Sequence, residues 1–151
     1  MTGAVRGMAI AAFLALLVSG CSIPRWPVDG GAEVTSPFGI RWTSTLPAVH
    51  RGVDIRAPHG TPVRAMASGT VSYAGWMSGF GNVVWIEHRD NLLTIYAHLS
   101  EIRVNRGDPV DGREVVGLAG STGTATGAHL HFEVWMNGRP VDPVSFLGRR
   151  P

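Results

Sequence analysis

The stretch GAHLHFEV places two imidazole side chains two positions apart in a segment typical of a buried β-strand. Side chains at positions i and i+2 of a strand share one face and lie about 6.6 Å apart. His129 and His131 therefore point the same way, together with Glu133, while the apolar residues between them point to the other face. The apolar face can pack in a core, so the histidine face needs polar partners or a metal ion.

A second group of possible metal ligands occurs in the stretch HRGVD. In a straight strand His50 and Asp54 would lie about 13 Å apart. One ion cannot bridge that distance, so we expect a bend, which Gly52 can provide. With the histidine pair, these residues predict a site of two histidines and one aspartate. Spacing alone leaves open whether His129 and His131 both bind the ion, or one binds it and the other lies beside it.

The other three histidines occur singly. His98, in TIYAHLS, shares a strand face with Tyr96 if the strand alternates regularly. It is a candidate site residue only because the other histidines are present. His59 lies in a Pro/Gly turn, and His88 lies at the end of an apolar run before a turn. We expect these last two to be solvated or capping residues.

The elements that must position these residues are short apolar runs, broken by Gly, Pro, Asn and Asp every eight to twelve residues. This spacing predicts an all-β fold, an antiparallel sandwich or barrel, and no long stretch after Cys21 has a helical apolar period. The segment GLAGSTGTATG directly precedes the histidine strand. It lacks the Gly-Lys-Ser/Thr ending of a phosphate loop. It is either a flexible surface loop or the thin wall of a cleft.

The N-terminus has the pattern of an export signal: Arg6, the apolar run MAIAAFLALLV, then small residues before Cys21. LVSGC resembles a bacterial lipobox, so we expect residues 1–20 to be removed and Cys21 to carry lipid. The alternative is an ordinary signal with a chance cysteine. Ser22 at the next position indicates the outer membrane, with the protein facing the periplasm. Residues 21–33 read as a tether, and residues 34–147 as the folded domain.

The composition fits one compact domain, with 151 residues of which 44% are hydrophobic. The formal net charge is only +2, and all 13 basic residues are scattered arginines. This small excess argues against a nucleic-acid partner.

Four blocks resemble, in order, the lysostaphin-type zinc metallopeptidases that cut peptidoglycan: HRGVDIRAPHGTPVRAMASGTVSYAG, GFGNVVWIEH, LLTIYAHLS and GSTGTATGAHLHFEV. The resemblance implies the antiparallel fold called the duplicated hybrid motif, with one zinc ion in an open groove. It implies that His50, Asp54 and His131 are the zinc ligands and that His98 and His129 are catalytic. A tyrosine that some relatives carry shortly before the first zinc histidine is absent from TSTLPAV.

The resemblance therefore predicts a zinc endopeptidase that hydrolyses the peptide cross-links of peptidoglycan, with stem peptides as substrate. Zinc would lower the pKa of a water molecule and polarise the peptide carbonyl. The alternative is a non-catalytic module of the same fold that binds peptidoglycan or activates other wall hydrolases. The sequence leaves open whether a regulatory protein partner is needed. A faint likeness of VRAMASGTV to biotinyl and lipoyl carriers fails because the chain has no lysine to modify.

Overall fold

The computed structural model describes residues 23–30, 33–42 and 46–148, and the predicted signal peptide and Cys21 lie outside them. Twelve strands and one short helix follow one another in this part of the chain: β1 (Val34–Ser36), β2 (Gly39–Trp42), β3 (Pro47–His50), β4 (Val53–Arg56), β5 (Pro62–Arg64), β6 (Gly69–Met77), β7 (Gly81–Glu87), β8 (Leu92–Ile102), β9 (Pro109–Val110), β10 (Val115–Ala119), β11 (His129–Met136), β12 (Arg139–Val141) and α1 (Pro143–Leu147).

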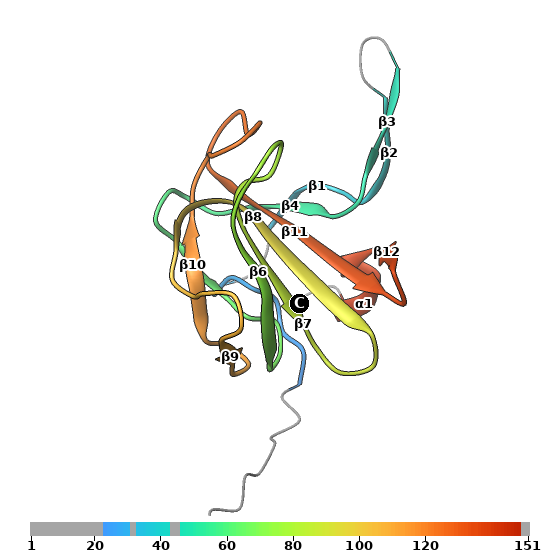
Figure 1. The fold of residues 1–151 in the computed structure, drawn as a ribbon. Helices are drawn as coiled ribbons and strands as arrows, with labels where there is room; N and C mark the ends of the chain where they lie inside the picture. Colours follow the sequence, from blue (N-terminus) through green and yellow to red (C-terminus); the bar gives the residue numbers. More distant parts are fainter. Residues whose placement is uncertain (1–22, 31–32, 43–45, 149–151) are drawn as a thin grey trace, which may run out of the picture.

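Every strand pairing is antiparallel, which confirms the predicted all-β class. Ten strands form one sheet whose main path runs β1-β4-β11-β8-β7-β6-β9. β10 lies off this path and pairs with β8 and β5 (Figure 1), and its Val116 and Ala119 belong to the main apolar core. In the described residues, no helix is long and apolar enough to cross a membrane.

The strand β11 runs through the middle of the sheet, and its apolar side chains alternate as the sequence predicted. Leu130, Phe132 and Val134 are fully buried in the main core. Tyr96 of the neighbouring strand β8 packs on Phe132, with ring centroids 5.4 Å apart. A smaller apolar cluster that includes Ile95 is separate from the main core. The polar residues of β11 therefore lie on a face that the main core does not need.

Residues of the predicted tether are part of this core. Trp26 is 4% exposed and packs against Phe132, and Val28 is 2% exposed. The Arg25 N–H donates to the Met66 carbonyl oxygen, and Asp29 forms an ion pair with Arg64. The folded domain thus begins before residue 34, and the prediction of a tether is wrong for this stretch. Isolated Trp and Val between prolines and glycines have no apolar period, so the local sequence does not indicate their burial.

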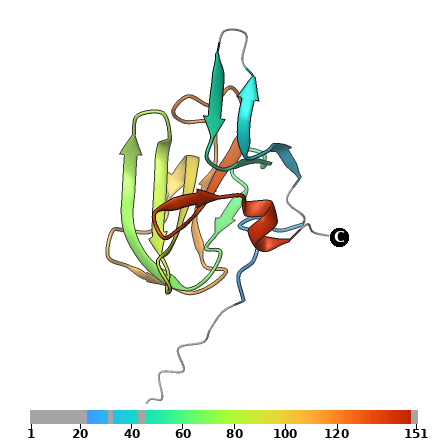
Figure 2. The same ribbon diagram turned by 90° about the vertical axis from the view of Figure 1, so that its right-hand side faces the viewer.

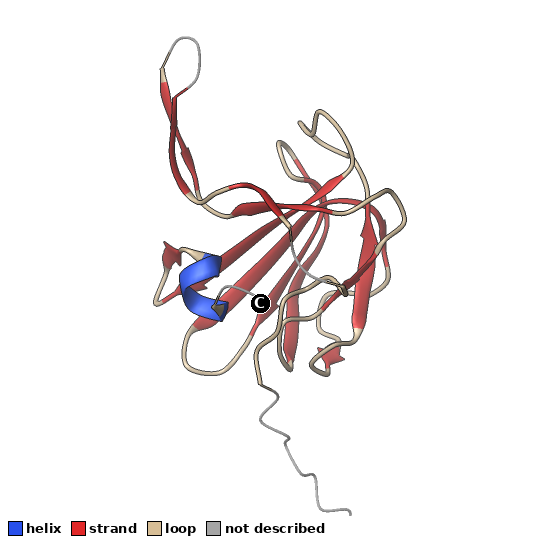
Figure 3. Cartoon of the chain, turned by 180° about the vertical axis from the view of Figure 1, so that it is seen from behind, coloured by secondary structure: helices blue, strands red, loops and turns tan. Residues whose placement is uncertain are grey.

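The hairpin β2–β3 forms its own two-stranded sheet and extends away from the large sheet (Figures 1 and 2). Gly39 pairs with His50 at its base, and Trp42 pairs with Pro47 toward its tip. At the other end of the chain, α1 packs beside β11 (Figure 3). Asp142 caps this helix by accepting a hydrogen bond from the Val144 N–H at 3.0 Å. The sequence pattern had not indicated this helix.

His88 and Thr94 belong to a buried polar chain beside the main core. His88 Nδ1 donates to the Ser68 carbonyl oxygen at 2.9 Å, because a carbonyl can only accept. His88 Nε2 then accepts from the Thr94 hydroxyl at 2.7 Å. The Tyr96 hydroxyl completes the chain, since it lies 2.9 Å from Thr94 Oγ1 and accepts from the Met66 N–H. Burial lowers the pKa of His88 despite the Ser68 carbonyl, so His88 is a structural residue, whereas His59 is exposed.

Candidate functional site

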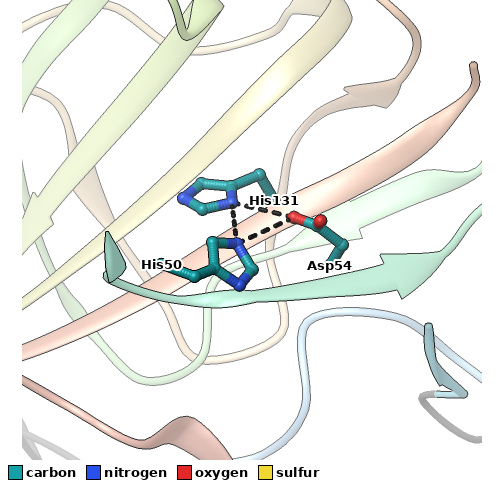
Figure 4. Close-up of side chains that lie close together, drawn as sticks. All are labelled: His50, Asp54 and His131. Carbon is teal, nitrogen blue, oxygen red and sulfur yellow. Dashed lines mark hydrogen bonds and ion pairs between the residues drawn. The ribbon is translucent and has the colours of Figure 1, made fainter. Parts of the chain in front are cut away.

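Three strands bring His50, Asp54 and His131 together (Figure 4). β3 ends at His50, the chain turns at Gly52, and β4 carries Asp54 directly opposite His131 of β11. A Cβ atom on Gly52 would lie 2.3 Å from the Phe132 carbonyl oxygen, so only glycine lets the turn approach β11 this closely. The bend expected between His50 and Asp54 is therefore present, and the close approach is what requires glycine.

The three side chains form a compact triangle of acceptor atoms. His131 Nδ1 lies 2.9 Å from Asp54 Oδ1 and 3.1 Å from His50 Nε2, and His50 Nε2 lies 3.2 Å from Asp54 Oδ1. His50 Nδ1 donates to the Pro37 carbonyl oxygen at 2.7 Å. In the neutral imidazole this leaves a lone pair on His50 Nε2, which faces the other two atoms.

Glu133 sets the tautomer of His131 in the same way. His131 Nε2 lies 2.9 Å from Glu133 Oε1 and donates to it, so the Nδ1 lone pair faces Asp54. Glu133 is only 2% exposed, and its other oxygen accepts from the Trp135 indole N–H at 2.5 Å. Strand alternation predicted Glu133 on this face without indicating its role. Its alternation with His129 and His131 was the available signal.

Arg41 of β2 approaches the same triangle from the hairpin. Its Nη2 lies 2.9 Å from Asp54 Oδ2 and 2.7 Å from His50 Nε2, and it also contacts His50 Nδ1. Burial alone would raise the pKa of Asp54, but its close polar contacts with His131, His50 and the Arg41 guanidinium hold it far below its usual range. Asp54 is therefore ionised at neutral pH, and its negative charge attracts a cation.

His98 reaches the site through an irregularity of β8. Its φ angle is +61°, and the register of β8 with β7 shifts by one residue between the pairs Val84–Tyr96 and Asn82–Leu99. One extra residue on β8 is the signature of a β-bulge. Tyr96 consequently faces the main core while His98 faces His129 and His131. The expectation that Tyr96 and His98 share a face is wrong, because it assumed regular alternation.

His98 and His129 form a pair beside the triangle, with ring centroids 4.8 Å apart. His98 Nδ1 donates to the Thr122 carbonyl oxygen at 2.8 Å, and His129 Nδ1 donates to the Gly127 carbonyl oxygen at 2.9 Å. Each therefore keeps an unprotonated Nε2, and that of His129 lies 3.7 Å from Asp54 Oδ1. Burial, outweighing the Thr122 hydrogen bond, lowers the pKa of His98, which favours its neutral form.

An open groove contains these residues. Its floor holds His50, Asp54, His98, His129 and His131, and its walls include Phe80, Arg41, Arg51 and residues 124–126. The stretch 124–126 belongs to the glycine- and threonine-rich segment before β11, so that segment is a cleft wall. It is held in place because the Thr124 N–H donates to the Gly79 carbonyl oxygen at 3.0 Å.

The triangle fits a zinc ion by chemistry and by size. Two imidazole nitrogens and one carboxylate oxygen are donors that catalytic zinc prefers. Donors about 2.1 Å from a tetrahedral ion lie about 3.4 Å from one another. The observed separations of 2.9 to 3.2 Å between the three donor atoms are close to this value. In the described residues, this is the one group of His, Cys, Asp and Glu with converging ligand atoms.

Known proteins resemble this chain in sequence and in fold. Over 115 residues the chain is 48% identical with the "DD-carboxypeptidase/endopeptidase Mpg" of Neisseria meningitidis, a match that covers 75% of this chain and only 26% of Mpg. The "zinc containing peptidase" from Vibrio cholerae superposes with a TM-score of 0.75 at 39% identity, over 80% of this chain and 38% of that one.

The catalytic domain of lysostaphin from Staphylococcus simulans superposes with a TM-score of 0.70 at 34% identity, over 77% of this chain and 92% of that domain. Residues 48–143 match the family described as "Peptidase family M23", a stretch that contains all five histidine and aspartate positions of the groove. The resemblance inferred from the sequence motifs is thereby confirmed, and the chain belongs to peptidase family M23.

Proposed function

We propose that this chain is a zinc-dependent endopeptidase that hydrolyses the peptide cross-links of bacterial peptidoglycan. The observation that carries the proposal is the convergence of four imidazole nitrogens and one carboxylate on one open groove. Each of the four histidines has its far ring nitrogen bonded to an oxygen, so each turns a lone pair toward the groove. Relatives named as endopeptidases support the reaction class.

We assign the metal to His50, Asp54 and His131. When bound there, zinc supplies a Lewis acid that polarises a peptide carbonyl and lowers the pKa of water. Asp54 contributes the single negative charge of the ligand set, and Arg41 orients its carboxylate by holding Oδ2. Glu133 holds His131 in the tautomer that presents Nδ1. The chain thus orients its ligands before a metal ion arrives.

We assign proton transfer to His98 and His129, taken as a pair. Their free Nε2 atoms are acceptors that the ligand triangle does not use. Either Nε2 can accept the proton of the attacking water and later donate it to the departing amine. Burial keeps the pKa of His98 below its ordinary value, so this imidazole is neutral and ready to accept a proton at pH 7.

Digestion of purified cross-linked peptidoglycan tests the proposal. The full chain, purified in detergent, is stripped of metal, then assayed with and without zinc, and the products are read by mass spectrometry. We expect zinc-dependent loss of cross-linked peptide dimers, and no loss with His129→Ala loaded with the same zinc. Bound zinc without any cleavage would instead favour a non-catalytic module that binds the wall or activates another hydrolase.

We further propose that residues 1–20 are an export signal and that Cys21 carries lipid, which anchors the domain to the outer membrane on its periplasmic side. The sequence pattern around Cys21 supports this assignment. Mass spectrometry of the N-terminal peptide tests it. We expect an acylated Cys21 at the N-terminus and transfer of the protein to the soluble fraction in Cys21→Ala, whereas an unmodified Cys21 peptide would refute lipidation.

A further inference from the structure

Arg51 is an exposed cation in the groove that has no carboxylate partner among the described residues. It follows His50 directly and lines the same groove as the ligand triangle. The other arginine of the groove, Arg41, forms an ion pair with Asp54 at 2.9 Å. The guanidinium of Arg51 lies over the ring of Trp135, with its carbon 5.9 Å from the ring centroid.

Trp135 is a fixed support for this guanidinium. Its indole N–H donates to Glu133 Oε2 at 2.5 Å, and Glu133 is buried between Trp135 and His131. A guanidinium held on an aromatic face keeps its N–H edges free for hydrogen bonds in its own plane. Two parallel N–H groups on such an edge match the two oxygens of a carboxylate. The free edge of the Arg51 guanidinium therefore matches a carboxylate in shape and charge.

The two carboxylates of the groove have other partners. Asp54 accepts from Arg41, and Glu133 accepts from His131 and Trp135. Neither forms an ion pair with Arg51 in the described residues. Arg51 thus keeps an unpaired positive charge at the groove, which attracts an anionic part of a bound peptide.

We propose that Arg51 forms a carboxylate-binding subsite, and that the groove selects peptides with a free carboxylate close to the scissile amide bond. This inference rests on the proposed peptidase function and adds the chemical class of its substrate. Arg56 provides the matched contrast, because it lies five residues further along the same segment but pairs with Glu33 through two hydrogen bonds of 2.7 and 2.9 Å. Arg56 has its carboxylate within the chain, whereas Arg51 takes one from the substrate.

The test uses purified peptidoglycan in two forms, untreated and with its free carboxylates converted to carboxamides by a carbodiimide and ammonia. The zinc-loaded full chain in detergent is assayed at low substrate concentration, and the initial rate of cross-link loss is measured. A hydrogen-bonded ion pair of this kind corresponds to about a 10- to 100-fold change in rate. We expect the wild-type chain to cleave the untreated form faster by that factor.

Arg51→Gln should lower the rate on the untreated form to that on the amidated form, and leave the rate on the amidated form unchanged. Arg51→Lys should restore part of the preference, because it keeps the charge and loses the paired N–H edge. Arg56→Gln should keep the full preference. Zinc content and thermal unfolding of each variant should equal those of the wild-type chain.

Two results would overturn the inference while leaving the peptidase intact: equal wild-type rates on both forms, or a preference that persists in Arg51→Gln. Failure of the wild-type chain to cleave either form would instead refute the proposed function on which the inference rests.

Discussion

Glu133→Gln is the most informative substitution next to the ligand triangle, because it preserves shape and removes one acceptor. Glu133 accepts two hydrogen bonds, from His131 Nε2 at 2.9 Å and from the Trp135 indole at 2.5 Å. A glutamine amide offers one oxygen and one NH₂ group. It can serve only one of the two donors, and its NH₂ group must face the other.

The expected loss follows from these two contacts. A hydrogen bond to a charged group contributes about 1.5 to 3 kcal/mol, and Glu133 is buried, so solvent does not replace it. Loss of a partner that orients a metal-binding histidine typically lowers metal affinity about 10- to 100-fold. We therefore expect the zinc dissociation constant of Glu133→Gln to rise by about that factor. Trp135→Phe should raise it much less, since the contact of Glu133 with His131 remains.

Competition with a zinc-binding fluorophore at constant pH measures both constants, and circular dichroism confirms that each variant is folded. The double variant Glu133→Gln/Trp135→Phe supplies the decisive comparison. With the indole N–H gone, the glutamine oxygen can turn to His131, so zinc affinity should partly recover. A zinc affinity of Glu133→Gln within twofold of wild type would refute the role assigned to Glu133.

Three further predictions concern the framework. Gly52→Ala should lower the free energy of unfolding by about 1 to 3 kcal/mol in a denaturant titration, because its Cβ atom would clash with the Phe132 carbonyl; an unchanged midpoint would contradict this close approach. The pKa of His88 lies below its ordinary value of 6.5, mainly through burial, so the unfolded state takes up its proton first. Wild-type stability should therefore fall, relative to His88→Gln, as the pH drops below 6.5 and level off below the folded pKa, and parallel pH profiles would contradict this. Trp26→Ala should cost about 3 to 5 kcal/mol in the same denaturant titration, whereas a loss below 1 kcal/mol would mean that residues before 34 do not stabilise the domain.

Regular patterns in the sequence predicted the parts of the site that lie on regular structure. The alternation of β11 placed His129, His131 and Glu133 on one face because that strand is unbroken from His129 to Met136. The need for a bend between His50 and Asp54 was also evident, since a straight strand separates them too far. The assignment of ligand and catalytic roles came from the family resemblance and remains a proposal.

Features that depend on irregular backbone or on distant contacts were not predictable from spacing. A bulge at His98 turns this residue away from Tyr96, and no residue type near it marks an extra position in β8. Trp26 reaches Phe132 across more than a hundred residues of sequence, a contact that no local pattern encodes. The pairing of Arg41 with Asp54 likewise depends on where the separate β2–β3 hairpin meets the large sheet.

The proposed roles of the five groove residues are tested by the zinc content of their alanine variants, measured on dialysed protein by mass spectrometry of the metal, with peptidoglycan cleavage assayed on the same samples. We expect the variants at His50, Asp54 and His131 to lose zinc and cleavage together. Those at His98 and His129 should keep about one zinc per chain and lose cleavage alone. Zinc retained at the wild-type level in a His131→Ala chain, or lost from His98→Ala and His129→Ala, would contradict the division of the groove into ligands and proton-transfer groups.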